Sequence, residues 1–146
     1  MQFSVQVHLA KYDPELFQLI RRKLIETGVP SDNIHYTSDN TLPIKHDGGV
    51  LYHVWVAGKR WSNLVPAFKR SIADTDPDKN IIVVMWEKSP KNIPYYHAER
   101  QQDREEMAKS RTLKHIRGVH GKNVSVFMTL DGAMMKFTQL LRANQS

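Results

Sequence analysis

The sequence predicts an α/β fold, with a mixed, mostly parallel sheet of four to five strands flanked by helices. One observation is the unbroken apolar run NIIVVMW at 80–86, which is rich in β-branched residues. A strand that is covered on both faces has this pattern, so we expect it at the centre of the sheet. The other observation is that strand-like and helix-like segments alternate along the chain.

A third observation favours a different architecture. The first strand, at 3–9, and the last, at 123–130, alternate between apolar and polar residues. This alternation is typical of strands with one exposed face, so we expect both strands near the edges of the sheet. The alternative fold is a ferredoxin-like α+β core with a C-terminal extension.

In the first strand the polar side chains share one face, and we expect His8 among them to be a surface residue. The apolar face consists of Phe3, Val5, Val7 and Leu9, and the polar face consists of Ser4, Gln6 and His8.

A helix is predicted from Pro14 to about Thr27. Asp13 is suited to the N-cap, Pro14 to the first helical position, and Gly28 to the C-cap. The apolar stripe of this helix consists of Leu16, Leu19, Ile20 and Leu24.

The segment up to the central strand contains a short strand at 33–37, a polar loop at 38–49, a strand at 50–56 and a helix at 62–73. Pro66 is expected in or near the first turn of that helix, where proline is tolerated. Residues 96–113 predict a highly charged helix with few apolar positions. Asp131 is suited to cap a last helix, whose apolar face consists of Met134, Met135, Phe137, Leu140 and Leu141.

The composition bounds the function. The chain of 146 residues has the size of one domain, and it contains no cysteine, which excludes disulfides, zinc–thiolate sites and thiol nucleophiles. We find no signal segment and no apolar run of roughly 20 residues, so we expect a protein of the cytosol or nucleus that does not enter a membrane. No P-loop, dinucleotide fingerprint or serine elbow is present, and we expect no cofactor, metal or catalytic residue.

The net charge of +6 and the pI of about 9.6 favour an anionic partner, most commonly nucleic acid. The first candidate site is the segment 111–122, where cations flank a glycine-bearing loop that could bind phosphate. Its residues are Arg111, Lys114, His115, Arg117 and Lys122. The alternative is a solvated helix end whose cations complement the helix dipole.

The second candidate site is Gly58-Lys59-Arg60-Trp61, directly after a strand. Lys59 and Arg60 could bind a phosphate while Trp61 stacks on a base, although Trp61 could equally pack in the core. Tyr96 is a third candidate for stacking, and the alternative for it is packing at a helix start.

Two resemblances concern metal and phosphate chemistry. The strand at 51–56 is similar to the metal-binding strand of rolling-circle replication endonucleases, but Trp55 stands where that family has its second histidine. His35-Tyr36-Thr37 is similar to one half of the two-histidine phosphoesterase pattern. The other half would be His115-Ile116-Arg117, in which Arg117 departs from the pattern. This resemblance implies that His35 and His115 act as base and acid on a phosphodiester.

The element order resembles that of signalling domains of the Toll/interleukin-receptor type. The comparable piece is the strand around Val54, followed by Arg60-Trp61-Ser62 and a helix. Catalytic members carry a glutamate shortly after that tryptophan, whereas the helix predicted at 62–73 has no acid. The resemblance therefore implies an adaptor and not an enzyme that cleaves nucleotides.

The leading hypothesis is a non-enzymatic binding module for RNA, DNA or another polyanion, with contacts mainly to phosphate. The alternatives are a small phosphoesterase that uses His35 and His115, and a protein-interaction adaptor. In the adaptor the apolar face of the last helix would form a homodimer.

Overall fold

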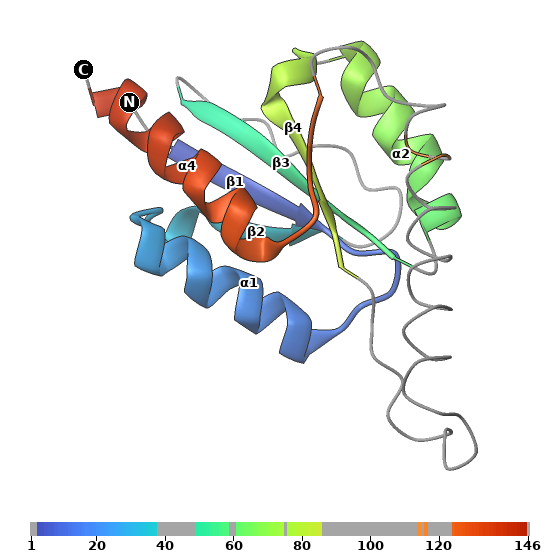
Figure 1. Cartoon of the computed structure of the whole chain (residues 1–146), viewed down its shortest axis with the longest axis horizontal. Helices are drawn as coiled ribbons and strands as arrows, with labels where there is room; N and C mark the ends of the chain where they lie inside the picture. The colour runs from blue at the N-terminus through green and yellow to red at the C-terminus, as the bar shows by residue number, and fades with distance from the viewer. Residues whose placement is uncertain are drawn as a thin grey trace.

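The computed structural model describes residues 3–37, 49–58, 61–74, 76–85, 114, 116 and 124–145. Its five strands form one parallel sheet in the order β2-β1-β3-β4-β5, as Figure 1 shows. The strands are β1 (Phe3–His8), β2 (Ile34–Thr37), β3 (Val50–Ala57), β4 (Asn80–Val84) and β5 (Ser125–Phe127). The α/β prediction is confirmed, and the ferredoxin-like alternative is wrong because that fold needs antiparallel strands.

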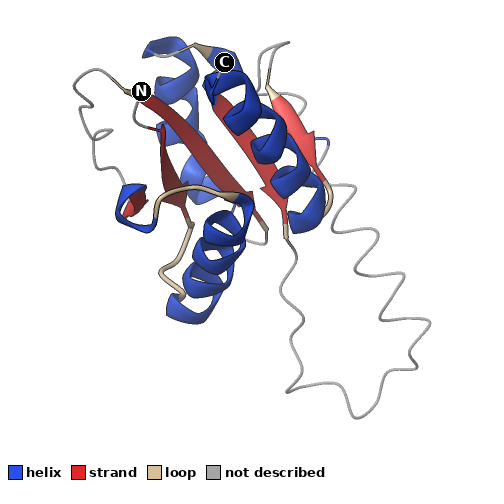
Figure 2. Ribbon diagram, turned by 90° about the vertical axis from the view of Figure 1, so that its left-hand side faces the viewer, coloured by secondary structure: helices blue, strands red, loops and turns tan. Residues whose placement is uncertain are grey.

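Helices cover both faces of this sheet (Figure 2). They are α1 (Pro14–Thr27), α2 (Trp61–Asp74) and α4 (Leu130–Gln145). One hydrophobic cluster joins α1 and α4 to one face, around Val5, Val54 and Phe137. A second cluster joins α2 to the other face, around Trp55, Phe68 and Ile82. The chain therefore winds in both directions from the centre of the sheet, as in doubly wound folds.

Strand β1 lies inside the sheet, between β2 and β3, and all six of its side chains are buried. It is next to the edge strand β2, but the prediction that one of its faces is exposed is wrong. The prediction that His8 is a surface residue is wrong too, because His8 is 6% exposed. The alternation was a poor guide because the polar face of this strand is also covered.

The strand at the centre of the order is β3, and β4 lies beside it, between β3 and β5. The prediction that residues 80–86 form a strand with both faces covered is confirmed for Asn80–Val84, all of which are buried. Its predicted place at the centre of the sheet is wrong, because β3 lies there. The last strand lies at an edge as predicted, and it is shorter than expected, with three residues.

The predicted limits of α1 are confirmed. Asp13 accepts a hydrogen bond from the backbone N–H of Leu16 at 3.1 Å. At the other end Gly28 has a φ of 122°, and its N–H bonds to the carbonyls of Leu24 and Ile25. This left-handed conformation favours glycine, which is why the helix ends there.

The other two helices depart from prediction in detail. Pro66 lies inside α2, past its first turn. In α4 the hydroxyl of Thr129, not Asp131, accepts the hydrogen bond from the N–H of Gly132, at 3.0 Å. Met135 is 69% exposed, whereas Ala133, Met134, Phe137 and Leu141 are buried against the sheet. Most of the apolar face of α4 therefore packs in the core, and a homodimer through this helix stays a prediction.

The predicted loop at 38–49 and the predicted helix at 96–113 lie almost entirely outside the described residues. Lys114 and Ile116 have helical backbone conformation. None of the helices in the described ranges combines the length and apolar character needed to cross a membrane.

Candidate functional site

The order of the strands reverses between β1 and β3. The chain leaves β1 toward β2 on one side and leaves β3 toward β4 on the other. In open α/β sheets the carboxyl ends of the two strands at this point border the crevice where ligands bind. We call this end of the sheet the carboxyl edge. It contains the ends of β1 at His8 and of β3 at Ala57.

Directly beneath the carboxyl edge, two histidines from the neighbouring strands β1 and β3 form a buried pair. Nε2 of His8 lies 2.9 Å from Nδ1 of His53, which is hydrogen-bonding distance. The imidazole of His8 also stacks on the indole of Trp55, with ring centroids 3.7 Å apart and planes 8° apart. His53 is 1% exposed, so both rings of the pair are shielded from water.

Burial keeps both rings neutral. The pKa of His8 is lowered from 6.5 to about 3, mainly by burial and to a lesser extent by repulsion from His53. Burial lowers the pKa of His53 from 6.5 to about 4. At neutral pH one ring therefore donates an N–H to the bare nitrogen of the other. The tautomer of one ring then fixes the tautomer of its partner.

A second buried network begins at Trp55 and ends at the opposite end of the sheet. The Trp55 indole N–H donates to Oδ1 of Asn80 at 3.0 Å, and the Ser71 hydroxyl donates to the same oxygen at 2.8 Å. The Asn80 side-chain amide donates to the carbonyl of Asp76 at 3.3 Å. Asn80 thus ties β3, β4 and α2 together.

The strand register explains why these polar residues meet. Gln6 pairs with His35 on one side and with His53 on the other, and His53 pairs with Asn80. Paired residues of neighbouring strands point to the same face. One polar row therefore crosses four strands on the α2 face. The sequence alone does not predict this row, because its members are far apart in the chain.

The turn between β3 and α2 lies at the carboxyl edge. The Trp61 N–H donates to the Gly58 carbonyl at 3.1 Å. A Cβ built on Gly58 would lie 2.8 Å from the Met85 carbonyl oxygen, so only glycine fits there without a shift. Lys59 and Arg60, between these two ends, lie outside the described residues.

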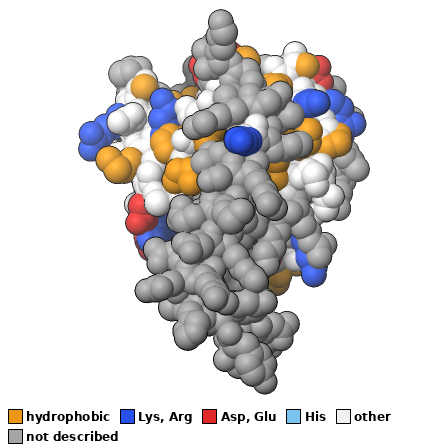
Figure 3. All heavy atoms as spheres, turned by 45° about the vertical axis from the view of Figure 1, so that its right-hand side comes forward, with side chains coloured by type: hydrophobic (Ala, Val, Ile, Leu, Met, Phe, Trp, Pro, Cys, Tyr) orange, Lys and Arg blue, Asp and Glu red, His pale blue; other side chains and the backbone are white. Residues whose placement is uncertain are grey.

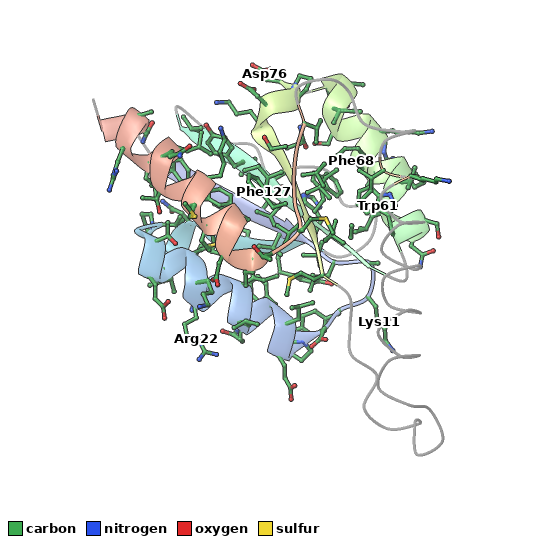
Figure 4. All side chains as sticks on the ribbon, in the orientation of Figure 1. Lys11, Arg22, Trp61, Phe68, Asp76 and Phe127 are labelled. Atoms are coloured by element: carbon green, nitrogen blue, oxygen red, sulfur yellow. The ribbon has the colours of Figure 1, made fainter. Side chains whose placement is uncertain are left out.

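Trp61 was predicted as a stacking residue with core packing as the alternative. Its indole is 3% exposed and packs against Phe68, with ring centroids 5.4 Å apart (Figure 4). This burial favours the core-packing alternative, because a stacked base needs an exposed ring face. In the described part of the chain, the buried Nε1 of Trp61 and the buried hydroxyl of Ser4 have no hydrogen-bond partner.

Most of the other predicted site residues are not described. Tyr96, Arg111, His115, Arg117 and Lys122 lie outside the described residues. Lys114 is exposed, and Ile116 is fully buried in the cluster on the α2 face. His115 itself is not described, so its role in a two-histidine phosphoesterase pattern stays a prediction.

The β1–α1 loop presents residues that the sequence analysis did not select. Lys11 is exposed, and Tyr12 is 57% exposed. The Tyr12 ring lies against Tyr36 of β2, with centroids 4.8 Å apart, and Tyr36 in turn contacts Phe17 of α1 at 5.6 Å. The sequence signal that could have pointed to these residues is a basic residue followed by an aromatic one, directly after a predicted strand.

Charged side chains of both signs lie at each end of the sheet, with Lys11, Asp13 and Glu15 at the carboxyl edge and Lys79 among the aspartates of the amino end. Figure 4 shows Lys11 at the carboxyl edge and Asp76 at the opposite, amino end. Asp32, Asp76 and Asp78, all exposed, lie in or beside the short 3-10 turns that lead into β2 and β4 at that amino end. On the surface drawn in Figure 3, the described basic side chains lie at several separate places.

Within the described ranges no group of three or more histidines or carboxylates is placed to hold a metal ion. No family model matches the sequence, and neither a curated protein nor a solved structure matches the chain.

Proposed function

We propose that this protein is a non-enzymatic binding module for an anionic partner, and that the partner is RNA or DNA held through its phosphates. The observation that supports this most is the position of α2. This helix begins at the carboxyl edge, beside the point where the strand order reverses, and its first turn contains no acid. Lys59 and Arg60 precede it in the sequence.

The start of a helix favours an anion because its first backbone N–H groups are not used within the helix and the dipole is positive there. The starts of the other described helices differ. α1 has Asp13 as its cap and Glu15 in its first turn, and α4 has Asp131 in its first turn. Among the described helices, α2 therefore offers the start best suited to a phosphate.

One exposed cation of the described residues lies at the same edge. Lys11 is exposed there and would attract a phosphate, while Asp13 and Glu15 at the start of α1 leave the α2 side of this edge as the more favourable one. Lys114 is exposed as well, and we propose that the segment from Arg111 to Lys122 adds further phosphate contacts. The net charge of +6 supplies long-range attraction.

The test is fluorescence anisotropy with labelled RNA and DNA, single- and double-stranded, at about 50 and about 200 mM salt. Binding is expected to weaken log-linearly with salt. Replacing Lys59 and Arg60 together with alanine should weaken binding and reduce the salt slope by about 1.4 to 1.8, because two phosphate contacts are lost.

The matched control replaces Lys136 and Arg142 of α4 with alanine, which removes the same charge from another helix. This control is expected to keep most of the affinity and of the salt slope. Absence of binding at low salt, or an equal loss in both double variants, contradicts the proposal. Cleavage of the probes would instead favour an enzyme.

A further inference from the structure

The exposed tyrosine in the β1–α1 loop is the starting point. Tyr12 is 57% exposed, and among the described residues it is the one large aromatic side chain with such exposure. A solvated aromatic ring gains nothing for the fold from its free face. Lys11, next to it in the chain, is exposed too.

The Tyr12 ring is held in place although it faces solvent. One side of it rests against Tyr36, with centroids 4.8 Å apart and planes at 56°. Tyr36 is supported by Phe17, whose ring meets it edge-on at 5.6 Å. Asp13, the next residue, caps α1 and fixes the backbone there. A ring that is already ordered loses little entropy when a ligand stacks on it.

The position of these residues connects them to the proposed phosphate contacts. Tyr36 lies near the end of β2, and Lys11 and Tyr12 follow β1, so all three lie at the carboxyl edge. The turn before α2 follows β3, which is the other neighbour of β1. Measured along the sheet, the two places are separated by one to two strand spacings, on the order of 10 Å, and they lie toward opposite faces, because Tyr36 packs with α1 whereas α2 covers the other face.

From this arrangement we infer that Tyr12, Tyr36 and Lys11 form a stacking site for an unpaired base of a single-stranded nucleic acid. The inference rests on the proposed function and names the partner more narrowly. Stacking needs a base whose face is free, and the bases inside a duplex offer no such face. Every base has a flat face, so this site selects single strands without selecting a sequence.

The charges nearby set the side on which the backbone of the nucleic acid passes. Glu15 is exposed in the first turn of α1, and Asp13 is the cap of that helix. Both repel phosphate, whereas Lys11 attracts it. The strand is therefore expected to pass on the Lys11 side of the stacked base, toward the turn before α2.

The test compares four proteins, which are the unchanged chain, Tyr12→Ala, Tyr12→Phe and, as a control, Met135→Ala. Met135 is an exposed apolar residue on α4, so its removal matches the loss of exposed side chain elsewhere. Each protein is titrated into labelled single strands of uridine or adenosine and into a duplex of equal length. Circular dichroism and thermal unfolding show whether each variant keeps its fold.

The unchanged protein is expected to prefer single strands. Tyr12→Ala should lose roughly tenfold in single-strand affinity and little in duplex affinity, because only a stacked base depends on the ring. Tyr12→Phe keeps the ring and should stay within about twofold. A Tyr12→Ala variant that binds single strands as tightly as the unchanged protein overturns the inference.

The outcomes separate this inference from the proposed function. If removing Lys59 and Arg60 weakens binding and removing Tyr12 does not, the phosphate contacts stand and the stacking site fails. If Tyr12→Ala weakens binding and the Lys59/Arg60 variant does not, the stacking site stands and the phosphate contacts at α2 fail. If the unchanged protein binds no nucleic acid, both fail.

Discussion

His8 and His53, which lie 45 residues apart in the chain, meet with their ring nitrogens 2.9 Å apart inside the sheet. Both rings are buried, and Trp55 covers one of them. Protonation of this pair places a charge where there is little water to solvate it. The pair therefore links the stability of the fold to pH.

The free energy of unfolding is expected to fall as the solution becomes acidic. An unfolded histidine titrates near 6.5, whereas the folded pKa is about 3 for His8 and about 4 for His53. Below about pH 6.5 the unfolded chain thus binds more protons than the folded protein. The stability that the neutral pair contributes is complete above that pH and is lost as the pH falls toward 4, by on the order of 1 kcal/mol per pH unit.

Urea unfolding at about pH 7.5, 6 and 5 measures this dependence. The double variant His8→Gln/His53→Gln lacks the two histidines and keeps every carboxylate. Its free energy of unfolding should therefore fall less between these pH values than that of the unchanged protein. Equal pH dependence in the two proteins would show that the buried pair does not control the acid response.

Asn80→Ala is expected to lower the free energy of unfolding by about 3 kcal/mol. The Asn80 side-chain oxygen accepts from both Trp55 and Ser71, and both donors lose their buried acceptor in this variant. Thermal or urea unfolding measures the loss. The control is Asn63→Ala, an exposed asparagine of α2, which should change stability by less than about 0.5 kcal/mol.

Gly58→Ala is expected to destabilise the protein by about 1 to 3 kcal/mol. The added methyl group would lie 2.8 Å from the Met85 carbonyl oxygen, which is backbone and cannot turn aside as a side chain can. Chemical denaturation measures the free energy of unfolding of this variant and of the control Ser62→Ala, an exposed position in the first turn of α2. Similar values for the two variants would mean that the ends of β3 and β4 can move apart to accept the methyl group at little cost.

Thr129→Ala is expected to cost about 1 kcal/mol, because the N–H of Gly132 loses its capping oxygen. Lys23→Ala removes the ion pair with Asp131, in which the charged atoms are 3.8 Å apart and both side chains are well exposed. Water and salt screen such a pair, so this change should cost less than about 0.5 kcal/mol. Thermal unfolding ranks the two variants, and the reverse order would contradict the assignment of Thr129 as the cap.

The sequence predicted the elements whose limits depend on neighbouring residues. Asp13, Pro14 and Gly28 mark both ends of α1 by chemistry within one turn of the chain, and the structure confirms them. Thr129 and Asp131 show how narrow this success is. Either residue can cap a helix, and only the exact backbone position decides which one accepts the hydrogen bond.

The sequence could not predict contacts that depend on how strands align. His8 alternates with apolar residues as a surface residue would, and its burial follows only once β1 is placed between β2 and β3. The hydrogen bond between Trp55 and Asn80 likewise follows only once β3 is aligned with β4. Tyr12 was missed for a different reason, since its exposure depends on where β2 places Tyr36.

The order of the strands also determines how the sheet can assemble during folding. Each of the five described strands pairs with strands that lie beyond a helix or a long segment in the sequence, and no two of these five are joined by a hairpin. β1 is made first, yet both of its neighbours are made later. His8 of β1 can therefore contact His53 only after β3 has been made and has paired with β1. Parallel pairing of this kind closes long loops before it gains contacts, which makes the early folding steps slow.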